Sequence, residues 1–309
     1  MVEAALILGR ALQFAAAVVL FGTPLFCLYG FPRTADAGES GSWIRPVLRA
    51  SSFAALAAAF MLLSAQTAEM SGDPRDALNL DTIWAVVSDT HVGRVWLLRL
   101  PLILIAISLA LWAPRRLGLW AAQALVGAGL AASLSWSGHG AQGDGPARVI
   151  HQFADGLHLL AAGAWLGALP PLAMLLVRAA RQASQANLAH FALARFSGIG
   201  PAVVAVLVLT GLINSWFLIG PQHLAAAVAS PYFWVLMIKL GLFAAMLALA
   251  AANRFLLTPR LARDLESGPG AVVTRLKRSV CAETALAALV IAAVAVLGTL
   301  APPIAGEGG

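Results

Sequence analysis

The chain has 309 residues, of which 60% are hydrophobic and only 11% charged, and its formal net charge is +6. A soluble domain of this length would carry about a quarter charged residues, so the composition excludes an ordinary soluble globular protein. The apolar residues form runs of roughly 20, the length of a membrane-spanning helix, without the alternation that a β-barrel needs. We therefore predict an all-α, polytopic integral membrane protein, a single membrane domain over 1–309 with eight transmembrane helices at about 11–30, 46–68, 92–113, 117–137, 150–177, 197–219, 231–256 and 279–301.

The first apolar run follows Glu3 and Arg10 and contains Gln13. It is longer than the apolar core of a signal peptide, and no clear cleavage site precedes the next polar sequence. We expect it to be retained as the first membrane helix; a cleaved signal peptide is the alternative.

Charged residues are sorted between the two sides of the predicted membrane. The connections at 31–49, 113–117, 178–196 and 254–278 hold fourteen basic residues against four acidic ones, whereas the other face holds four basic and eight acidic residues. The positive-inside rule places the basic connections in the cytoplasm and both termini outside. Because the positive charge follows the topology, it does not indicate nucleic-acid binding.

Residues that can bind cations lie outside, between the second and third helices. Glu69 and Met70 end the second helix, and an acidic stretch over 69–89 leads to His91 at the start of the third. Carboxylate, thioether and imidazole groups are all metal ligands. These residues are secondary candidates, because Met70 is more simply a packing residue and His91 a surface histidine.

The fifth helix carries the strongest functional signal. His151, Asp155 and His158 are spaced i, i+4 and i+7, so they share one helical face, and ionisable groups inside a membrane helix are functional candidates. His139 follows the fourth helix on the same side, in a glycine-rich loop that can bring it over the fifth. Imidazole and carboxylate ligands suit Cu(II) or Zn(II). We predict a metal site at His139, Asp155 and His158, with His151 secondary because it lies nearer the surface; the alternative for His158 is an interhelical hydrogen bond.

Two cations lie inside the outer half of the predicted membrane, Arg99 in the third helix and Lys239 in the seventh. Each has three possible roles: an ion pair with Asp155, an ion pair with Glu69, or extension to the lipid headgroups.

Glu283 lies near the cytoplasmic end of the last helix, and Arg254 ends the preceding one. A pair between these residues would be structural, or would form an inner gate in a transporter.

The two halves of the chain resemble each other at an offset of about 140–146 residues. An Arg-x-Ser motif opens both the second and the sixth helix, and Gln13 corresponds to His158. This pattern predicts a tandem repeat of two four-helix units, 1–140 and 141–309, related by an axis along the membrane normal. The second half then carries an ionisable ligand where the first half has an amide.

The sequence contains no phosphate-binding loop, nucleophile elbow, HExxH motif or soluble catalytic domain. We therefore expect no enzyme activity and no ATP-driven pumping by this chain. Histidines in four-helix membrane units also ligate haem, although His158 has no clear partner histidine deep in another helix.

An ordered set of residues resembles the CopD family of bacterial copper-resistance inner-membrane proteins. The resemblance covers about 90–309 well and rests on Ser137-Gly138-His139, Asp155, His158, Trp165-Leu166-Gly167, Arg195-Phe196-Ser197, Thr210-Gly211, Lys239, Asn253-Arg254, Glu283 and Pro302-Pro303. The chain departs from the family pattern at Ser230-Pro231-Tyr232-Phe233, where the family tends to have Thr-x-Tyr-Gly.

The resemblance implies a periplasm-facing copper site at His139, Asp155 and His158, inward passage of copper, and a periplasmic copper-binding partner of the CopC type. It places the chain in the bacterial cytoplasmic membrane, and the charge pattern then puts both termini in the periplasm. We predict a copper-handling protein that takes copper from the periplasm and imports it, with Glu283 near the inner exit. The alternatives are a haem-binding electron-transfer protein and a non-transporting copper sensor or scaffold.

Overall fold

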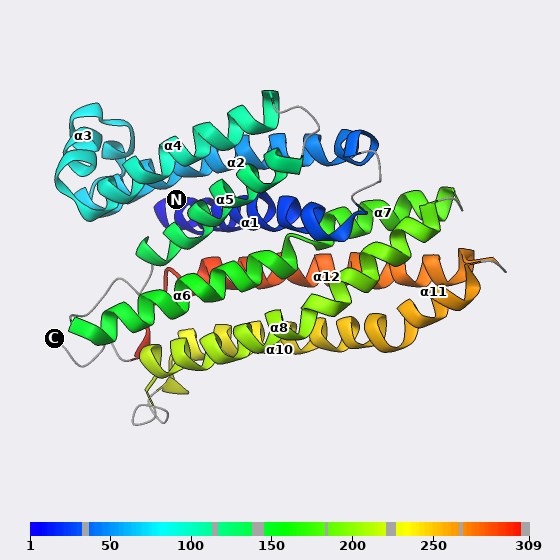
Figure 1. Cartoon of the computed structure of the whole chain (residues 1–309). Coiled ribbons are helices and arrows are strands. Elements are labelled where there is room, and N and C mark those ends of the chain that lie inside the picture. Colours follow the sequence, from blue (N-terminus) through cyan, green and yellow to red (C-terminus); the bar gives the residue numbers. More distant parts are fainter. Residues whose placement is uncertain are drawn as a thin grey trace.

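The computed structural model describes residues 1–32, 37–112, 117–137, 145–182, 185–220, 227–265 and 268–303, and these residues are almost entirely helical (Figure 1). No strand occurs within these ranges, which confirms the all-α prediction. The helices are α1 (Val2–Gly30), α2 (Ala37–Ser71), η1 (Pro74–Leu78), α3 (Leu80–Asp89), α4 (His91–Trp112), α5 (Leu117–Ser133), η2 (Leu134–Ser137), α6 (Gly145–Leu166), α7 (Leu169–Arg181), α8 (Ala186–Leu218), α10 (Pro231–Ala252), the π-helical turn η6 (Asn253–Leu257), α11 (Thr258–Asp264) and α12 (Gly270–Leu297).

Eight segments among the described residues are long and apolar enough to cross a membrane, which confirms the predicted number. The first begins at Val2 instead of residue 11, because Glu3 in its first turn suits the positive end of the helix dipole. The fifth runs from Gly145 to Arg181 and combines α6 with α7, so it is longer than predicted.

The fifth span is broken where α6 ends and α7 begins. Gly167 and Ala168 form a turn there, and prolines occupy the first positions of α7. Proline lacks a backbone N–H and cannot continue a helix, but its fixed φ suits a new first turn. The apolar face of α7 is buried, and Arg178 and Arg181 lie in its last turn, where cations complement the helix dipole.

The short helix α3 was not predicted. Asn79 caps it by accepting hydrogen bonds from the backbone N–H groups of Asp81 and Thr82. The helix buries Val86 and Val87 against α2 and α4, so part of the acidic stretch is a packed element.

Helix α1 lies at the centre of the molecule (Figure 1). It packs against α2 and α5 of the first half and against α6 and α12 of the second. One apolar core fills the first half around Leu20, Ile44 and Ile103, and a larger one fills the second half around Leu172 and Leu276. Beyond α1, α8 packs on α6 and α10 packs on α12.

The two halves meet most closely where α1 crosses α6. A Cβ atom on Gly22 would lie 1.9 Å from the carbonyl oxygen of Gly163, so the two backbones touch. Thr23 Oγ1 donates a hydrogen bond of 2.7 Å to the carbonyl of Gly167 across this contact. Small residues allow such close approach of membrane helices. The two-unit division at about residue 140 and its origin by duplication stay predictions.

Candidate metal centre

His158 is held by α6 and faces α8. Its Nδ1 lies 2.9 Å from Thr210 Oγ1, and Thr210 Oγ1 lies 2.6 Å from the carbonyl oxygen of Val206. A hydroxyl has one hydrogen, and the helix geometry directs it to Val206. His158 therefore donates from Nδ1, which leaves Nε2 unprotonated with a lone pair available to a metal ion.

The imidazole of His158 is positioned by packing as well. A Cβ atom on Gly211 would lie 3.6 Å from its Cε1, so the ring rests directly over this glycine of α8. Thr210 and Gly211 thus fix the direction and the tautomer of the ring together. Metal-binding histidines commonly donate their second ring nitrogen in this way.

Asp155 lies one turn before His158 on the same face of α6. Its Oδ1 accepts a hydrogen bond of 3.3 Å from Asn214 Nδ2, one turn after Thr210 on α8. The oxygen of the same side-chain amide, Asn214 Oδ1, is buried without a hydrogen-bond partner. Two oxygen donors and one imidazole nitrogen therefore belong to the facing surfaces of α6 and α8.

Lys239 adds a positive charge to this group from α10. Its ammonium interacts electrostatically with both Asp155 and His158. The predicted ion pair with Asp155 stays a prediction. A cation at this position stabilises the carboxylate and opposes the arrival of another cation.

His139 lies outside the described residues, so the predicted three-ligand set stays a prediction. Within the described ranges, no group of three His, Cys, Asp or Glu side chains is close enough to hold a metal ion. Asp155 and His158 therefore need a donor of another kind, such as the Asn214 amide oxygen, or one from His139.

The secondary candidates have other surroundings. The ring of His151 is buried and stacks on Phe217 of α8, with centroids 4.8 Å apart, so packing fixes it. His91, Glu69 and Met70 are exposed near the ends of α2 and α4.

Arg99 takes none of its predicted roles. Its guanidinium is buried and donates to Ser133, to Ser137 Oγ and, at 3.4 Å, to Gln13 Oε1. Neutral oxygens therefore replace the acidic partner or lipid headgroup that the sequence suggested. Gln13 contacts the cation of its own half, much as Asp155 and His158 interact with Lys239.

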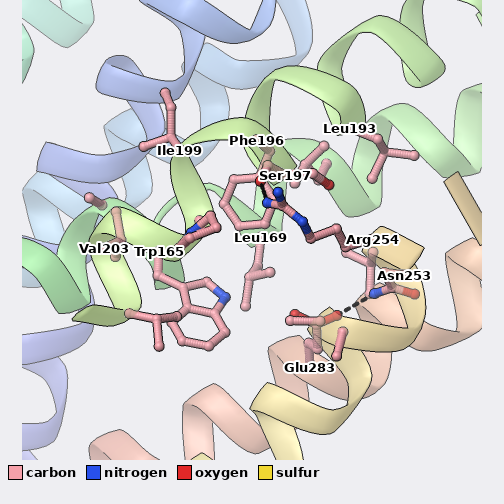
Figure 2. Close-up of a pocket in the computed structure, with 18 of the residues that line it drawn as sticks. Trp165, Leu169, Leu193, Phe196, Ser197, Ile199, Val203, Asn253, Arg254 and Glu283 are labelled. Atoms are coloured by element: carbon pink, nitrogen blue, oxygen red, sulfur yellow. Dashed lines mark hydrogen bonds between the residues drawn. The ribbon is translucent and has the colours of Figure 1, made fainter. Parts of the chain in front are cut away.

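Glu283 and Arg254 also differ from the prediction, since each has another partner instead of the suggested ion pair. Glu283 accepts a hydrogen bond from Asn253 Nδ2, and Arg254 donates to the carbonyl of Ser197 on α8 (Figure 2). Both residues line a pocket together with Trp165 of α6.

The sequence analysis gave no role to Thr210, Asn214 or Asn253. Thr210 and Asn214 are polar residues four positions apart inside an apolar helix, a spacing that marks one face. Asn253 precedes Arg254 in the resemblance, but its contact with Glu283 depends on the packing of η6 against α12.

Eight apolar helices that enclose a histidine and a carboxylate define a polytopic helical membrane protein with a candidate metal site in its second half. Comparison with known proteins agrees with this class. Residues 1–149 match the family model "Copper resistance protein D-like, N-terminal domain", and residues 190–297 match "Copper resistance protein D". The chain belongs to the copper resistance protein D family.

Three relatives illustrate the range of the family. Copper resistance protein D of Pseudomonas syringae pv. tomato is 33% identical over 288 residues, which is 92% of this chain and 93% of that protein. Inner membrane protein YebZ of Escherichia coli (strain K12) is 28% identical over 95% of this chain and 97% of its own length. Copper transport protein CutJ of Bacillus subtilis (strain 168) is 28% identical over 95% of this chain, which spans only 52% of CutJ. No solved structure matches the chain.

Proposed function

We propose that this protein takes copper from the periplasmic side of the cytoplasmic membrane and imports it, with Asp155 and His158 as the first intramembrane ligands. Relatives over nearly the whole chain are named for copper resistance, for copper transport and for the inner membrane. The eight membrane helices fit such a location. We do not assign the chain an enzymatic reaction, in keeping with those names.

The observation that carries the proposal is the hydrogen bond between His158 Nδ1 and Thr210 Oγ1. It leaves Nε2 free on a ring whose direction is fixed, one turn from a carboxylate. Copper(II) accepts imidazole and carboxylate ligands, and His139 is the third ligand that the sequence predicts.

The direction of the site follows from the sorting of charge. With the basic connections in the cytoplasm, both termini and the outer ends of α6, α8 and α10 face the periplasm. A periplasmic copper-binding protein of the CopC type delivers the ion there. Acidic residues between α2 and α4 raise the local cation concentration on that side.

Copper binding by the purified protein tests the site. His158→Ala should abolish binding of one equivalent, because it removes the imidazole one turn from Asp155 whose direction Thr210 fixes. His91→Ala is the matched control, since it removes an exposed histidine from the same side. Unchanged stoichiometry and affinity in His158→Ala would refute this assignment.

Uptake into sealed vesicles tests the import step. The wild-type protein should accumulate copper inside vesicles that carry it with the periplasmic face outward, and His158→Ala should not. Binding without accumulation would support the sensor or scaffold instead.

A further inference from the structure

A pocket of about 390 Å³ lies between α8 and α10, and Figure 2 shows part of its lining. Arg254, at the start of the basic connection after α10, is among the lining residues. We refer to this pocket as the inner pocket. Its walls are mostly apolar and come from α1, α6, α7, α8, α10, η6 and α12, with Val204 of α8 and Leu247 of α10 among the lining residues. Such a volume and lining are typical of sites for small organic ligands.

The inner pocket has one polar end, formed by buried groups. Glu283 is 1% exposed and Trp165 is 4% exposed, and both line the pocket. The indole Nε1 of Trp165 interacts with the Glu283 carboxyl but makes no hydrogen bond of normal geometry, and it points into the pocket on the side where Glu283 lies (Figure 2). A buried N–H without a well-formed hydrogen bond is stabilised when a bound molecule accepts from it.

Part of the lining of the inner pocket reaches the surface of the helix bundle. Ile199 of α8 is 40% exposed and Phe255 of η6 is 68% exposed, and both line the pocket. Helices α8 and α10 pack on α6 and α12 respectively and have little direct contact with each other. A molecule dissolved in the bilayer therefore has a lateral route between them.

The polar end does not suit an anion or a metal ion. Arg254 already donates to the Ser197 carbonyl, which ties η6 to α8, and the Glu283 carboxyl stands beside it. A phosphate head at this end would lie against the Glu283 carboxyl, whose negative charge repels it. A metal ion would find a single carboxyl among apolar walls, and the described residues contain no cluster of three ionisable ligands.

We infer that the inner pocket binds a lipophilic molecule with an uncharged, hydroxyl-bearing head. The apolar body fills the space between α8 and α10, and the hydroxyl oxygen accepts from Trp165 Nε1 while its hydrogen is donated to Glu283. An isoprenoid quinol and a diacylglycerol share this chemistry. The π-helical turn η6, a feature frequently found at functional sites, carries the Asn253 amide that positions the Glu283 carboxyl.

A matched pair of glycines tests the apolar part of the site. A Cβ atom on Gly200 or on Gly198 meets nothing within 4 Å, yet only Gly200 lines the inner pocket. With the full chain in phosphatidylcholine nanodiscs, Gly200→Leu should weaken binding at least tenfold, and Gly198→Leu should not change it. If Gly200→Leu fails to fold, Ala250→Leu fills the same pocket.

The probes are decyl-ubiquinol, dioctanoylglycerol and the dimethyl ether of the quinol, titrated one at a time. Trp165→Phe keeps the ring but removes the N–H, so it should weaken binding of the hydroxyl probes about fivefold. Trp96→Phe is its control, because Trp96 Nε1 donates to the Ala59 carbonyl in the other half of the molecule.

The inference is supported if either hydroxyl probe binds and its binding is weakened by both Gly200→Leu and Trp165→Phe. The identity of the probe that binds distinguishes a quinol ligand from a diacylglycerol. The inference is overturned if neither hydroxyl probe binds, if the ether binds as well as the quinol, or if both glycine variants behave alike. Copper is absent from these titrations, so their failure is separate from failure of the proposed copper site.

Discussion

The hydroxyl of Thr210 should set the copper affinity without touching the metal. Thr210→Val keeps the shape of the side chain but removes the acceptor for His158 Nδ1–H, which lies 2.9 Å away. The imidazole then loses its fixed tautomer, and the proton is free to move to Nε2, the nitrogen that should bind copper. We expect weaker copper binding at unchanged stoichiometry.

The magnitude follows from the kind of contact that is lost. A neutral hydrogen bond of this length contributes about 0.5–1.5 kcal/mol, and loss of the partner behind a metal-binding histidine costs about 10–100-fold in affinity. A tenfold loss of affinity corresponds to about 1.4 kcal/mol. The upper end of the hydrogen-bond range therefore meets the lower end of the affinity range. We therefore expect Thr210→Val to weaken binding about tenfold.

Competitive titration of the purified protein with a copper chelator measures this change. Thr284→Val is the matched control, because Thr284 Oγ1 donates to the carbonyl of Val280 within α12 just as Thr210 does within α8. The reasoning about the tautomer is refuted if Thr210→Val binds copper like the wild type while His158→Ala does not bind it. Equal losses in both threonine variants would point to a general effect on folding.

Three further changes test other features. Asp155→Asn should lower copper affinity at least tenfold in the same titration, because it removes the carboxylate one turn from His158; unchanged affinity would exclude Asp155 as a ligand. Lys239→Met should raise copper affinity at least about threefold by removing a repelling cation, whereas Lys277→Met, near the start of α12, should have no effect. Equal effects of the two changes would exclude a local cause. Gly22→Ala should destabilise the fold by about 1–3 kcal/mol or prevent folding, measured as a lower melting temperature, because its Cβ would meet backbone; Gly118→Ala, whose Cβ meets nothing, should melt as the wild type does.

The fold could be predicted from the sequence because membrane helices are specified locally. Each membrane helix needs about 20 apolar residues. Apart from a closed β-barrel, only a helix satisfies all of its backbone hydrogen bonds within lipid. The helix ends were less predictable, as α1 and α7 illustrate, because charged residues and prolines are tolerated at helix termini. Helix α3 was missed because its buried face is only two valines wide.

The site was predictable only in part, for a physical reason. The spacing of Asp155 and His158 along one helix identified them, since that face depends on α6 alone. The residues opposite them, Thr210 and Asn214, become partners only through the packing of α8 on α6. Arg99 was misassigned because a buried cation is as well satisfied by several neutral oxygens as by one acid, and the sequence does not say which lie nearby.

The contact between α1 and α6 has a consequence for the evolution of the protein. At Gly22 and Gly163 main-chain atoms of the two helices touch, so the backbones themselves limit how closely the helices approach there. Side chains elsewhere in the two apolar cores can change without altering this limit. Helix α6 carries His158 on one side of the crossing and Trp165 near it, so contact with the α1 backbone positions both sites. Side chains around the two sites can therefore change during evolution while α1 keeps α6 in place.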